Sequence, residues 1–335
     1  MLQDPAFEAF AAQDARFTVI GESLVDVIID PDTQTRMAHP GGSPMNVAVG
    51  CARLGLATDL ITHYADDPDG RLLDEHLQCN QVSVLRGGTA ATSNATATVG
   101  DDGSATYVFN VTWDIHGASL PALASVQAAT HVHTGSIATV LPPGDDSCFV
   151  LLQAAKGHAT ISYDPNCRPA ITPDVDAARR QAEMFVSASD IVKASDEDLK
   201  WLYPHRTPEE SLAAWLQLGP AIAALTQGAT GPVMLTRHGR VETLAEEVTV
   251  ADTVGAGDAF MAALIAGLAT LGALGAAGRQ RLQTLTRDEL HALTVYANHA
   301  AAIACSRPGA KPPYAAELGP LPTAQPGQGV GARED

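Results

Sequence analysis

The stretch Ala251-Asp-Thr-Val-Gly-Ala-Gly-Asp-Ala-Phe260 sets an acidic residue inside a glycine turn that opens an apolar helix. Residues 260–272 continue as an Ala- and Leu-rich run that stops at a glycine, which is typical of a helix and its end. The first four N–H groups of such a helix have no partner within it, and the helix dipole favours negative charge there. The turn is therefore predicted to bind a negatively charged group.

Asp258 stands where those backbone N–H groups converge, although a carboxylate would repel a phosphate. The residue is explained as a base that takes a proton from a hydroxyl, while the amides of Gly255, Ala256 and Gly257 receive the charge that moves onto a phosphoryl group. The alternative interpretation is that Asp258 only stabilises the helix N-terminus. A second motif is needed to decide between the two.

That motif is Pro40-Gly-Gly-Ser-Pro-Met-Asn-Val-Ala-Val-Gly-Cys-Ala-Arg-Leu-Gly55. Ser43 is predicted to cap a helix of about three turns, with Pro44 at its first position and Gly55 just past its end. The segment is therefore interpreted as a loop followed by a short helix.

Gly41 and Gly42 stand at the entrance of this helix without side chains and leave room for a small ligand. Asn46 in the first turn offers donors and an acceptor to the hydroxyls of that ligand. Taken alone, two glycines before a helix are usually just a turn.

Together the two segments resemble the signature motifs of the ribokinase-like (PfkB) carbohydrate kinases, and the resemblance runs from about residue 17 to about residue 313. Gly41, Gly42 and Asn46 match the first motif, and residues 252–258 match the second. The resemblance implies a three-layer α/β/α ribokinase-like fold with a mostly parallel central sheet and a small β-sheet lid. It also implies an ATP-dependent sugar kinase that uses Mg²⁺.

Length and composition agree with that fold. The 335 residues, 46% of them hydrophobic, can bury a large core, and we expect a single domain over residues 17–318. Short β-rich runs alternate with helical stretches, which is typical of an α/β protein. The expected strands cover residues 17–21, 58–62, 130–133, 160–163, 191–193, 221–226 and 232–236.

Two regions, residues 24–38 and 89–111, have β character without intervening helices, and the second turns as a hairpin at residues 101–103. In the family these segments form the lid over the sugar. Residues 1–15 and 322–335 are expected to be poorly ordered tails, since both lie outside the regular pattern and the second is rich in Pro, Gly and charge.

Composition excludes several classes of function. A formal net charge of −18 argues against nucleic-acid binding through a basic surface. There is no apolar run of membrane-spanning length and no signal peptide, so a cytoplasmic protein without membrane contact is expected. Five widely spaced cysteines argue against a disulfide framework or a zinc site.

P-loop, protein-kinase and dinucleotide fingerprints are missing. His131 and His133 lie in an apolar strand and are interpreted as structural.

Weaker motifs gain meaning from the resemblance. Asp26 follows the first core strand, and the matching aspartate of the family binds two sugar hydroxyls; its plain alternative is a turn residue. The stretch Tyr163-Asp-Pro-Asn-Cys-Arg-Pro169 is similar to one in fructokinase-like and ketodeoxygluconate-kinase-like members. It places Arg168 at a sugar oxygen or phosphate and Asn166 at the nucleotide phosphates or a metal-bound water, although two proline turns explain it equally well.

The nucleotide side is assigned to Lys193, Ser195, Thr226 and Gly228, with Gly231 shaping the turn and Asn298 offering its amide to the adenine or ribose. Ser195 and Asp198 replace the Asn and Glu that organise Mg²⁺ in the family, and Asp198 is expected to reach the ion through a water. Ser195 with its acidic first turn also suits a capped helix start. K⁺ is a further candidate cofactor, with Asp252 and Val254 beside the anion-binding turn as its matching positions.

The sequence therefore predicts transfer of the γ-phosphoryl group of ATP to a hydroxymethyl group, with fructose as the leading substrate. Ribose, 2-keto-3-deoxygluconate and adenosine remain alternatives within the family. A non-catalytic sugar-binding protein on the same fold is the alternative from a different class, and only the departure at Ser195 and Asp198 suggests it. An exposed lid edge would favour a homodimer through the lid.

Overall fold

The computed structural model describes residues 15–29, 33, 35–99 and 105–322. Its main sheet has the strand order β13-β12-β11-β10-β9-β8-β1-β4-β5. All neighbouring pairs from β11 to β5 are parallel, and β12 and β13 add antiparallel strands at one edge. The strands are β1 (Arg16–Ile20), β4 (Ala57–Thr62), β5 (Ser83–Arg86), β8 (His131–Gly135), β9 (Thr160–Asp164), β10 (Ile191–Ser195), β11 (Ile222–Thr226), β12 (Val233–Thr236) and β13 (Gly239–Glu242). The seven expected strands are confirmed within about two residues, whereas β5 and β13 were not predicted.

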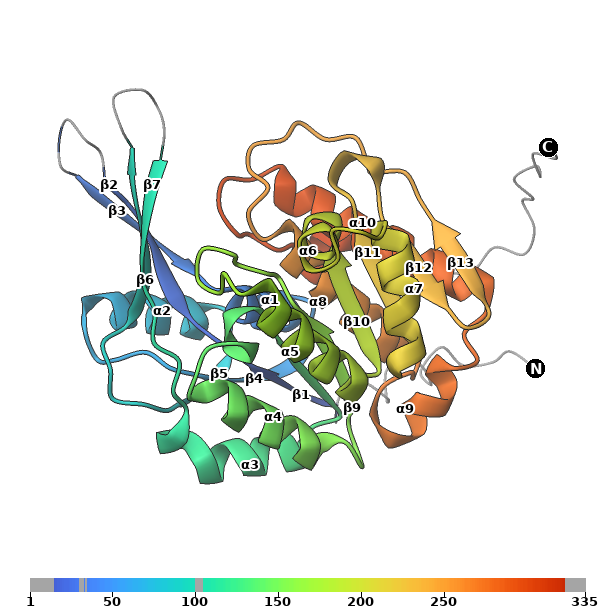
Figure 1. Cartoon of the computed structure of the whole chain (residues 1–335), viewed down its shortest axis with the longest axis horizontal. Coiled ribbons are helices and arrows are strands. Elements are labelled where there is room, and N and C mark those ends of the chain that lie inside the picture. The colour runs from blue at the N-terminus through green and yellow to red at the C-terminus, as the bar shows by residue number, and fades with distance from the viewer. Residues whose placement is uncertain (1–14, 30–32, 34, 100–104, 323–335) are drawn as a thin grey trace.

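Helices cover both faces of this sheet (Figure 1). One face packs against α3 (Ser119–Ala128), α4 (Gly144–Ala155), α5 (Val175–Ala188), α6 (Asp196–Leu202) and α7 (Pro208–Leu218). The other packs against α1 (Ser43–Arg53), α8 (Ala256–Thr270), α9 (Gly275–Leu282), α10 (Arg287–Cys305) and α11 (Ala315–Leu318). Successive strand residues point to opposite faces of the sheet. Ile191 of β10 packs on the face covered by α8, and Val192 packs on the face covered by α5. The predicted α/β/α class is confirmed.

The central helix α8 is apolar around its whole circumference, so it is buried between α1 and α10. Its position brings the predicted turn at its start into the middle of the molecule. The shorter α2 (Pro68–Cys79) packs on the side of α1, where Leu73 and Leu77 join a third core with residues of β1, β4 and the lid.

The lid is a separate sheet of order β3-β2-β6-β7 that projects from the main body (Figure 1). Its strands are β2 (Leu24–Ile29), β3 (Arg36–Gly41), β6 (Ser93–Val99) and β7 (Ala105–Asn110). The parallel pair β2–β6 joins the two predicted lid segments. The first segment runs three residues further than expected, to Gly41, while the predicted hairpin turn at residues 101–103 lies outside the described residues.

The predicted cap of α1 is wrong by one position. Gly42 is the N-cap, and Ser43 is already the first helical residue, with no side-chain cap bond. Gly55 follows the helix end with a φ of 87°, as expected. The predicted poorly ordered tails lie almost wholly outside the described residues.

No single helix among the described residues is long and apolar enough to cross a membrane. Only α8 and α9 together reach that length and composition, and they are bent by 97° relative to each other.

Candidate active site

A cleft of about 1230 Å³ opens at the carboxyl ends of the parallel strands, between the main body and the lid. The chain runs from β1 outward to β4 and β5 on one side and from β8 to β11 on the other, so the strand order reverses between β1 and β8. Open α/β sheets bind ligands at such a reversal. Single drug-sized ligands occupy roughly 300–1,000 Å³. The cleft can therefore hold a nucleotide and a second, smaller ligand.

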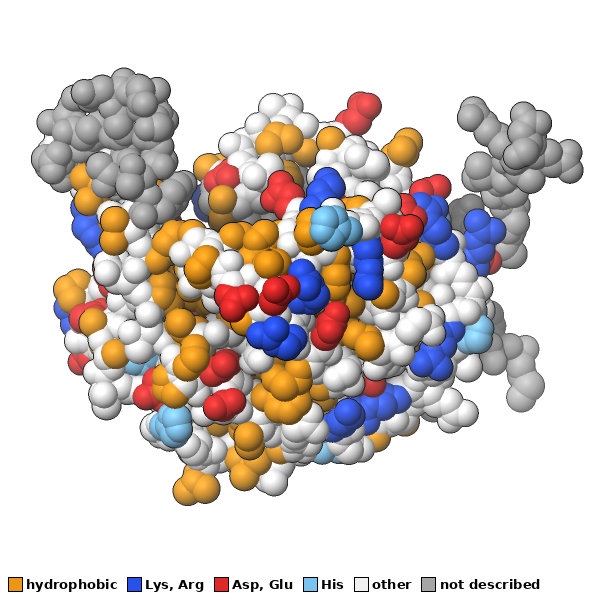
Figure 2. All heavy atoms as spheres, viewed as in Figure 1, with side chains coloured by type: hydrophobic (Ala, Val, Ile, Leu, Met, Phe, Trp, Pro, Cys, Tyr) orange, Lys and Arg blue, Asp and Glu red, His pale blue; other side chains and the backbone are white. Residues whose placement is uncertain are grey.

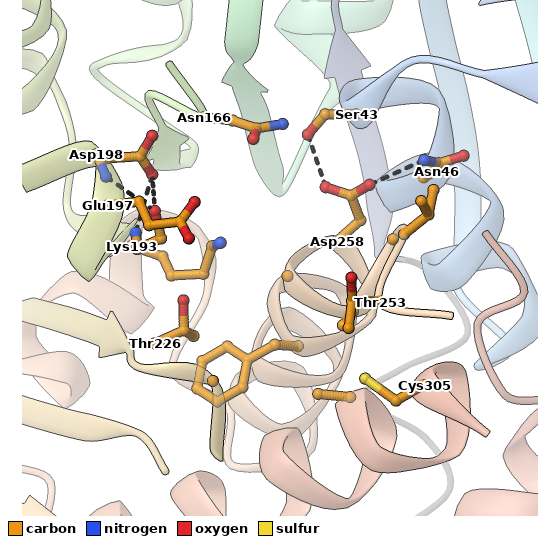
Figure 3. Close-up of a pocket in the computed structure, with 18 of the residues that line it drawn as sticks. Ser43, Asn46, Asn166, Lys193, Glu197, Asp198, Thr226, Thr253, Asp258 and Cys305 are labelled. Carbon is orange, nitrogen blue, oxygen red and sulfur yellow. Dashed lines mark hydrogen bonds between the residues drawn. The ribbon is translucent and has the colours of Figure 1, made fainter. Parts of the chain in front are cut away.

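Asp258 lies in the first turn of α8, on the wall of this cleft. The helix starts at Gly255, whose φ of 76° and close approach to Ala310 leave no room for a side chain. Two donors from α1 hold the carboxylate: Oγ of Ser43 at 2.7 Å from Oδ1 and Nδ2 of Asn46 at 2.9 Å from Oδ2 (Figure 3). The two motifs recognised in the sequence thus meet in one hydrogen-bonded group.

Burial raises the pKa of Asp258, whereas the hydrogen bonds from Ser43 and Asn46 and the charges of Lys193 and Arg168 lower it. Lys193 is buried and forms an ion pair with Asp164, with 2.8 Å between Nζ and Oδ2. A Cβ at Gly257 would stand only 2.8 Å from this Nζ atom. The ammonium group therefore lies against the glycine turn, where it can attract a phosphate.

Lys193 and Asp164 remain an ion pair although both side chains are buried. Burial lowers the pKa of Lys193, but the carboxylates of Asp164, Asp198 and Asp258 outweigh this and leave it raised. Burial raises the pKa of Asp164 to about 6, against the opposing charge of Lys193. Near neutral pH both groups are therefore charged, and the ammonium group of Lys193 lines the cleft.

The lid end of the cleft carries further carboxylates. Asp26 on β2 lines the cleft, and Gly41 allows its carboxylate to approach the backbone, since a Cβ there would stand 2.2 Å from Oδ2. Burial raises the pKa of Asp26, and the positive charges of Arg168 and His39 oppose the shift. Arg168 also lines the cleft, although its Nη1 donates to carbonyl and amide oxygens of its own loop.

Ser195 and Asp198 form a capping box at the start of α6. Oδ2 of Asp198 accepts from N and Oγ of Ser195, and Oδ1 accepts from the backbone N of Cys167. The predicted helix-cap role is confirmed. Asn166 lies on the same side of the cleft, and Glu197 is exposed and directed into it (Figure 3).

The other end of the cleft lies over β11. Thr226 and Gly228 line the cleft there, and Gly231 lies in the following turn, where a Cβ would stand 2.1 Å from the backbone oxygen of Thr243. Asn298 on α10 also lines the cleft, but its Nδ2 donates to the backbone oxygen of Leu244 at 2.9 Å. The amide thus tethers residues 244–250 to α10.

The positions expected to serve K⁺ lie in the turn before α8. The carboxylate of Asp252 accepts from the backbone N–H groups of Val254 and Gly309, so it joins this turn to residues 306–310. Val254 lines the cleft and is half exposed.

His131 and His133 are fully buried, and their ring nitrogens pair with Ser162 and Thr160. Burial lowers the pKa of His131 to about 3, so the ring is neutral. Among the described residues no group of three His, Cys, Asp or Glu side chains is placed to hold a metal.

Sequence reasoning missed four cleft features: the bond of Ser43 to Asp258, the ion-pair partner Asp164, the exposed Glu197 and the buried Glu22. Glu22 follows β1 and accepts from the backbone N of Ala138. The sequence signal for Glu22 was its place at a strand end, two residues after β1.

A buried carboxylate beside a glycine turn, in a cleft with room for two ligands, is the site of a phosphotransferase that acts on a hydroxyl group. Residues 14–316 match the description "pfkB family carbohydrate kinase", and the chain belongs to this family.

Curated relatives in this family include two bacterial fructokinases. The fructokinase of Rhizobium leguminosarum bv. trifolii is 33% identical over 259 residues, which cover 74% of this chain and 78% of that protein. The fructokinase of Klebsiella pneumoniae is 33% identical over 270 residues, which cover 77% and 86%.

Solved structures agree on the fold. A fructokinase from Xylella fastidiosa with bound ATP has a TM-score of 0.81 at 24% identity, over 91% of this chain and 97% of that one. A double mutant of the fructokinase from Vibrio cholerae O395, with fructose, ADP and potassium ion bound, has a TM-score of 0.74 at 26% identity, with the same coverage.

Proposed function

We propose that this sugar kinase is an ATP-dependent fructokinase that transfers the γ-phosphoryl group to a hydroxymethyl oxygen of fructose. The observation that carries the chemistry is Asp258, buried and ionisable beside the Gly255–Gly257 turn in a two-ligand cleft. Fructose is supported by the fructokinase relatives at 33% identity. Ribose, 2-keto-3-deoxygluconate and adenosine remain the alternative acceptors.

In the reaction, the O–H bond of the sugar breaks and its proton passes to the carboxylate of Asp258. The sugar oxygen forms a bond to the γ-phosphorus, and the bond from that phosphorus to the bridging oxygen breaks, so ADP leaves. The amides of Gly255, Ala256 and Gly257 and the ammonium group of Lys193 stabilise the charge on the transferring group. Positioning and charge therefore supply most of the catalysis.

The sugar is assigned to the lid end of the cleft. Asp26 accepts hydrogen bonds from two hydroxyls, and Asn46 and Arg168 offer donors. Gly41 and Gly42 keep the helix entrance open for the ring. Closure of the lid excludes water, which otherwise competes as the phosphoryl acceptor.

ATP is assigned to the other end, with Thr226, Gly228 and Asn166 toward the phosphates and Asn298 beside the base. Mg²⁺ neutralises the phosphates when bound. The described residues fit an ion held mainly by phosphate oxygens and water, because both oxygens of Asp198 already accept hydrogen bonds, which suits a contact through a water. Asp252 and Val254 are the proposed neighbours of K⁺, supported by the potassium ion in the Vibrio relative.

We also propose a cytoplasmic homodimer that pairs through the lid. Ile28, Met37 and Val108 leave apolar side chains exposed on the lid sheet. On the face seen in Figure 2, the described Lys and Arg side chains lie among acidic ones.

The test of the substrate is product analysis. Purified protein is incubated with ATP, Mg²⁺ and K⁺ and with fructose, ribose, 2-keto-3-deoxygluconate or adenosine, and each mixture is analysed by mass spectrometry. Phosphorylated fructose, formed with a kcat/KM at least tenfold above that of the other acceptors, is the expected result. Preference for another acceptor would contradict fructose as the substrate but would still support a kinase. Sugar binding without any phosphorylated product would favour the non-catalytic alternative.

A further inference from the structure

Ser43 makes a contact that its place in the sequence does not suggest. It is the first helical residue of α1, one position after the N-cap Gly42, and its side chain makes no cap bond. Its hydroxyl instead crosses the cleft wall to Asp258, 215 residues away, at 2.7 Å. Both side chains are almost fully buried, with 8% and 7% of their surfaces exposed. A buried hydroxyl that donates to a buried carboxylate of a distant segment points to a role in the reaction.

We propose that Ser43 is a positioning residue for phosphoryl transfer, whose hydroxyl fixes the carboxylate of Asp258 in the orientation from which it takes the substrate proton. The inference rests on the proposed function of Asp258 as the base. A carboxylate offers about four acceptor positions, of which Ser43 and Asn46 each use one. The remaining lone pairs stay available to the sugar hydroxyl, while rotation of the carboxylate is blocked.

Ser43 also affects the charge of the base. The ionisable groups that face Asp258 are Lys193 on β10, Arg168 after β9 and Asp164 at the end of β9. The two cations and the donors from α1 favour the ionised carboxylate, whereas burial and Asp164 oppose it. Loss of the Ser43 donor should therefore raise the pKa of Asp258. A hydrogen bond to a charged group is strong enough that its loss is expected to shift the pKa by about one unit.

The experiment compares the wild type with Ser43→Ala, which removes the donor, and Ser43→Thr, which keeps it. We measure kcat from pH 5.5 to 9, fructose affinity by titration, and Tm. Ser23→Ala is the matched control, because Ser23 is also buried and hydrogen-bonded, to Thr62, but does not line the cleft.

Ser43→Ala is expected to move the acid limb of kcat to higher pH by about one unit, which lowers kcat about tenfold on that limb. Fructose affinity should change less than about threefold, and Ser43→Thr should restore the acid limb. A Ser43→Ala variant that loses Tm but keeps the wild-type acid limb would show a merely structural hydroxyl and overturn the proposal.

A second measurement separates this proposal from the proposed function. Carbon-13 labelling of aspartate carboxyls, with the signal of Asp258 assigned by its loss in Asp258→Asn, follows the titration of the base without any turnover. A higher titration midpoint in Ser43→Ala supports the role of Ser43 even if fructose is not the substrate. An unchanged midpoint contradicts it even if the wild type phosphorylates fructose.

Discussion

At the scale of the residue, the cleft is built from charged side chains that burial alone would neutralise. Lys193 and Asp164 remain an ion pair because each is the other's partner within the protein interior. Asp258 is held by two donors from α1 in the same way. Glu22 lacks such compensation: burial raises its pKa to about 7, although the Ser136 side chain, the Arg168 charge and backbone donors lower it.

Glu22 predicts a pH dependence of stability. Between pH 4.5 and about 7 the folded protein keeps a proton at Glu22 that the unfolded chain has released, so the free energy of unfolding falls as pH rises through this interval. The full effect is at most ~3 kcal/mol. Glu22→Gln removes the titration, so its Tm relative to the wild type should be higher at pH 8 than at pH 5.

The control for this prediction is Glu75→Gln, at an exposed position on α2, whose Tm difference should not vary with pH. Melting curves at several pH values measure all three proteins. Parallel pH profiles of the wild type and Glu22→Gln would show that Glu22 does not hold the proton.

The residue contacts that sequence reasoning missed share a physical cause. Asp258, Asn46 and the glycines could be predicted because a helix start and its neighbours form a local pattern. The bond of Ser43 to Asp258 and the pairing of Lys193 with Asp164 join distant segments, and no local pattern encodes the partner. The cap assigned to Ser43 was wrong because Gly42 is the N-cap, so Ser43 lies inside the first turn, where its hydroxyl donates to Asp258.

At the scale of the element, the segment of residues 244–250 lines the end of the cleft that lies over β11, and it has no regular secondary structure. Two side chains of α10 hold it: Asn298 through the backbone of Leu244, and His299 through Glu246, at 2.7 Å between Nδ1 and Oε2. Asn298 was predicted to bind the adenine or ribose directly. His299 does not line the cleft. Substitutions of Asn298 and of His299 can therefore distinguish a residue that only holds segment 244–250 in place from one that contacts the ligand directly.

If these two hydrogen bonds hold segment 244–250 in place for ATP, Asn298→Ala and His299→Ala should both raise the KM for ATP. The expected increase is about 2- to 12-fold for the loss of one hydrogen bond in each variant. The KM for fructose and kcat should stay within about twofold. His291→Ala, at an exposed position on the same helix, is the control. Steady-state kinetics measure the effect, and an increase in Asn298→Ala alone would favour the direct contact.

The elements themselves could largely be predicted. The helix of residues 256–270 has an almost continuous apolar sequence, and the buried strands are short runs rich in β-branched residues, which composition and spacing detect. The edge strands β5 and β13 have only four residues each and are partly exposed, so they lack such a signal. The parallel pairing of β2 with β6 depends on segments about seventy residues apart along the chain and could come only from the family resemblance.

At the scale of the whole molecule, the lid is the element that we propose to close the cleft and to join two copies of the chain. Its exposed apolar residues favour a homodimer through this sheet. Sedimentation velocity of the wild type should then show a dimer at micromolar concentration, and Met37→Glu with Val108→Glu should yield a monomer. Leu120→Glu, at an exposed apolar position on α3, should leave the dimer intact. A monomeric wild type would contradict the proposal.

The central claim joins these scales: one buried carboxylate at the start of α8 is the base of a fructokinase. The most direct measurement is ADP release by the wild type and by Asp258→Asn, with ATP, Mg²⁺, K⁺ and fructose, together with the fructose affinity of both proteins. The account predicts fructose-dependent turnover by the wild type and a loss of at least about 100-fold in kcat for Asp258→Asn, with fructose binding retained. Substantial turnover by Asp258→Asn would contradict the assigned base, and fructose binding without turnover by the wild type would contradict the fructokinase.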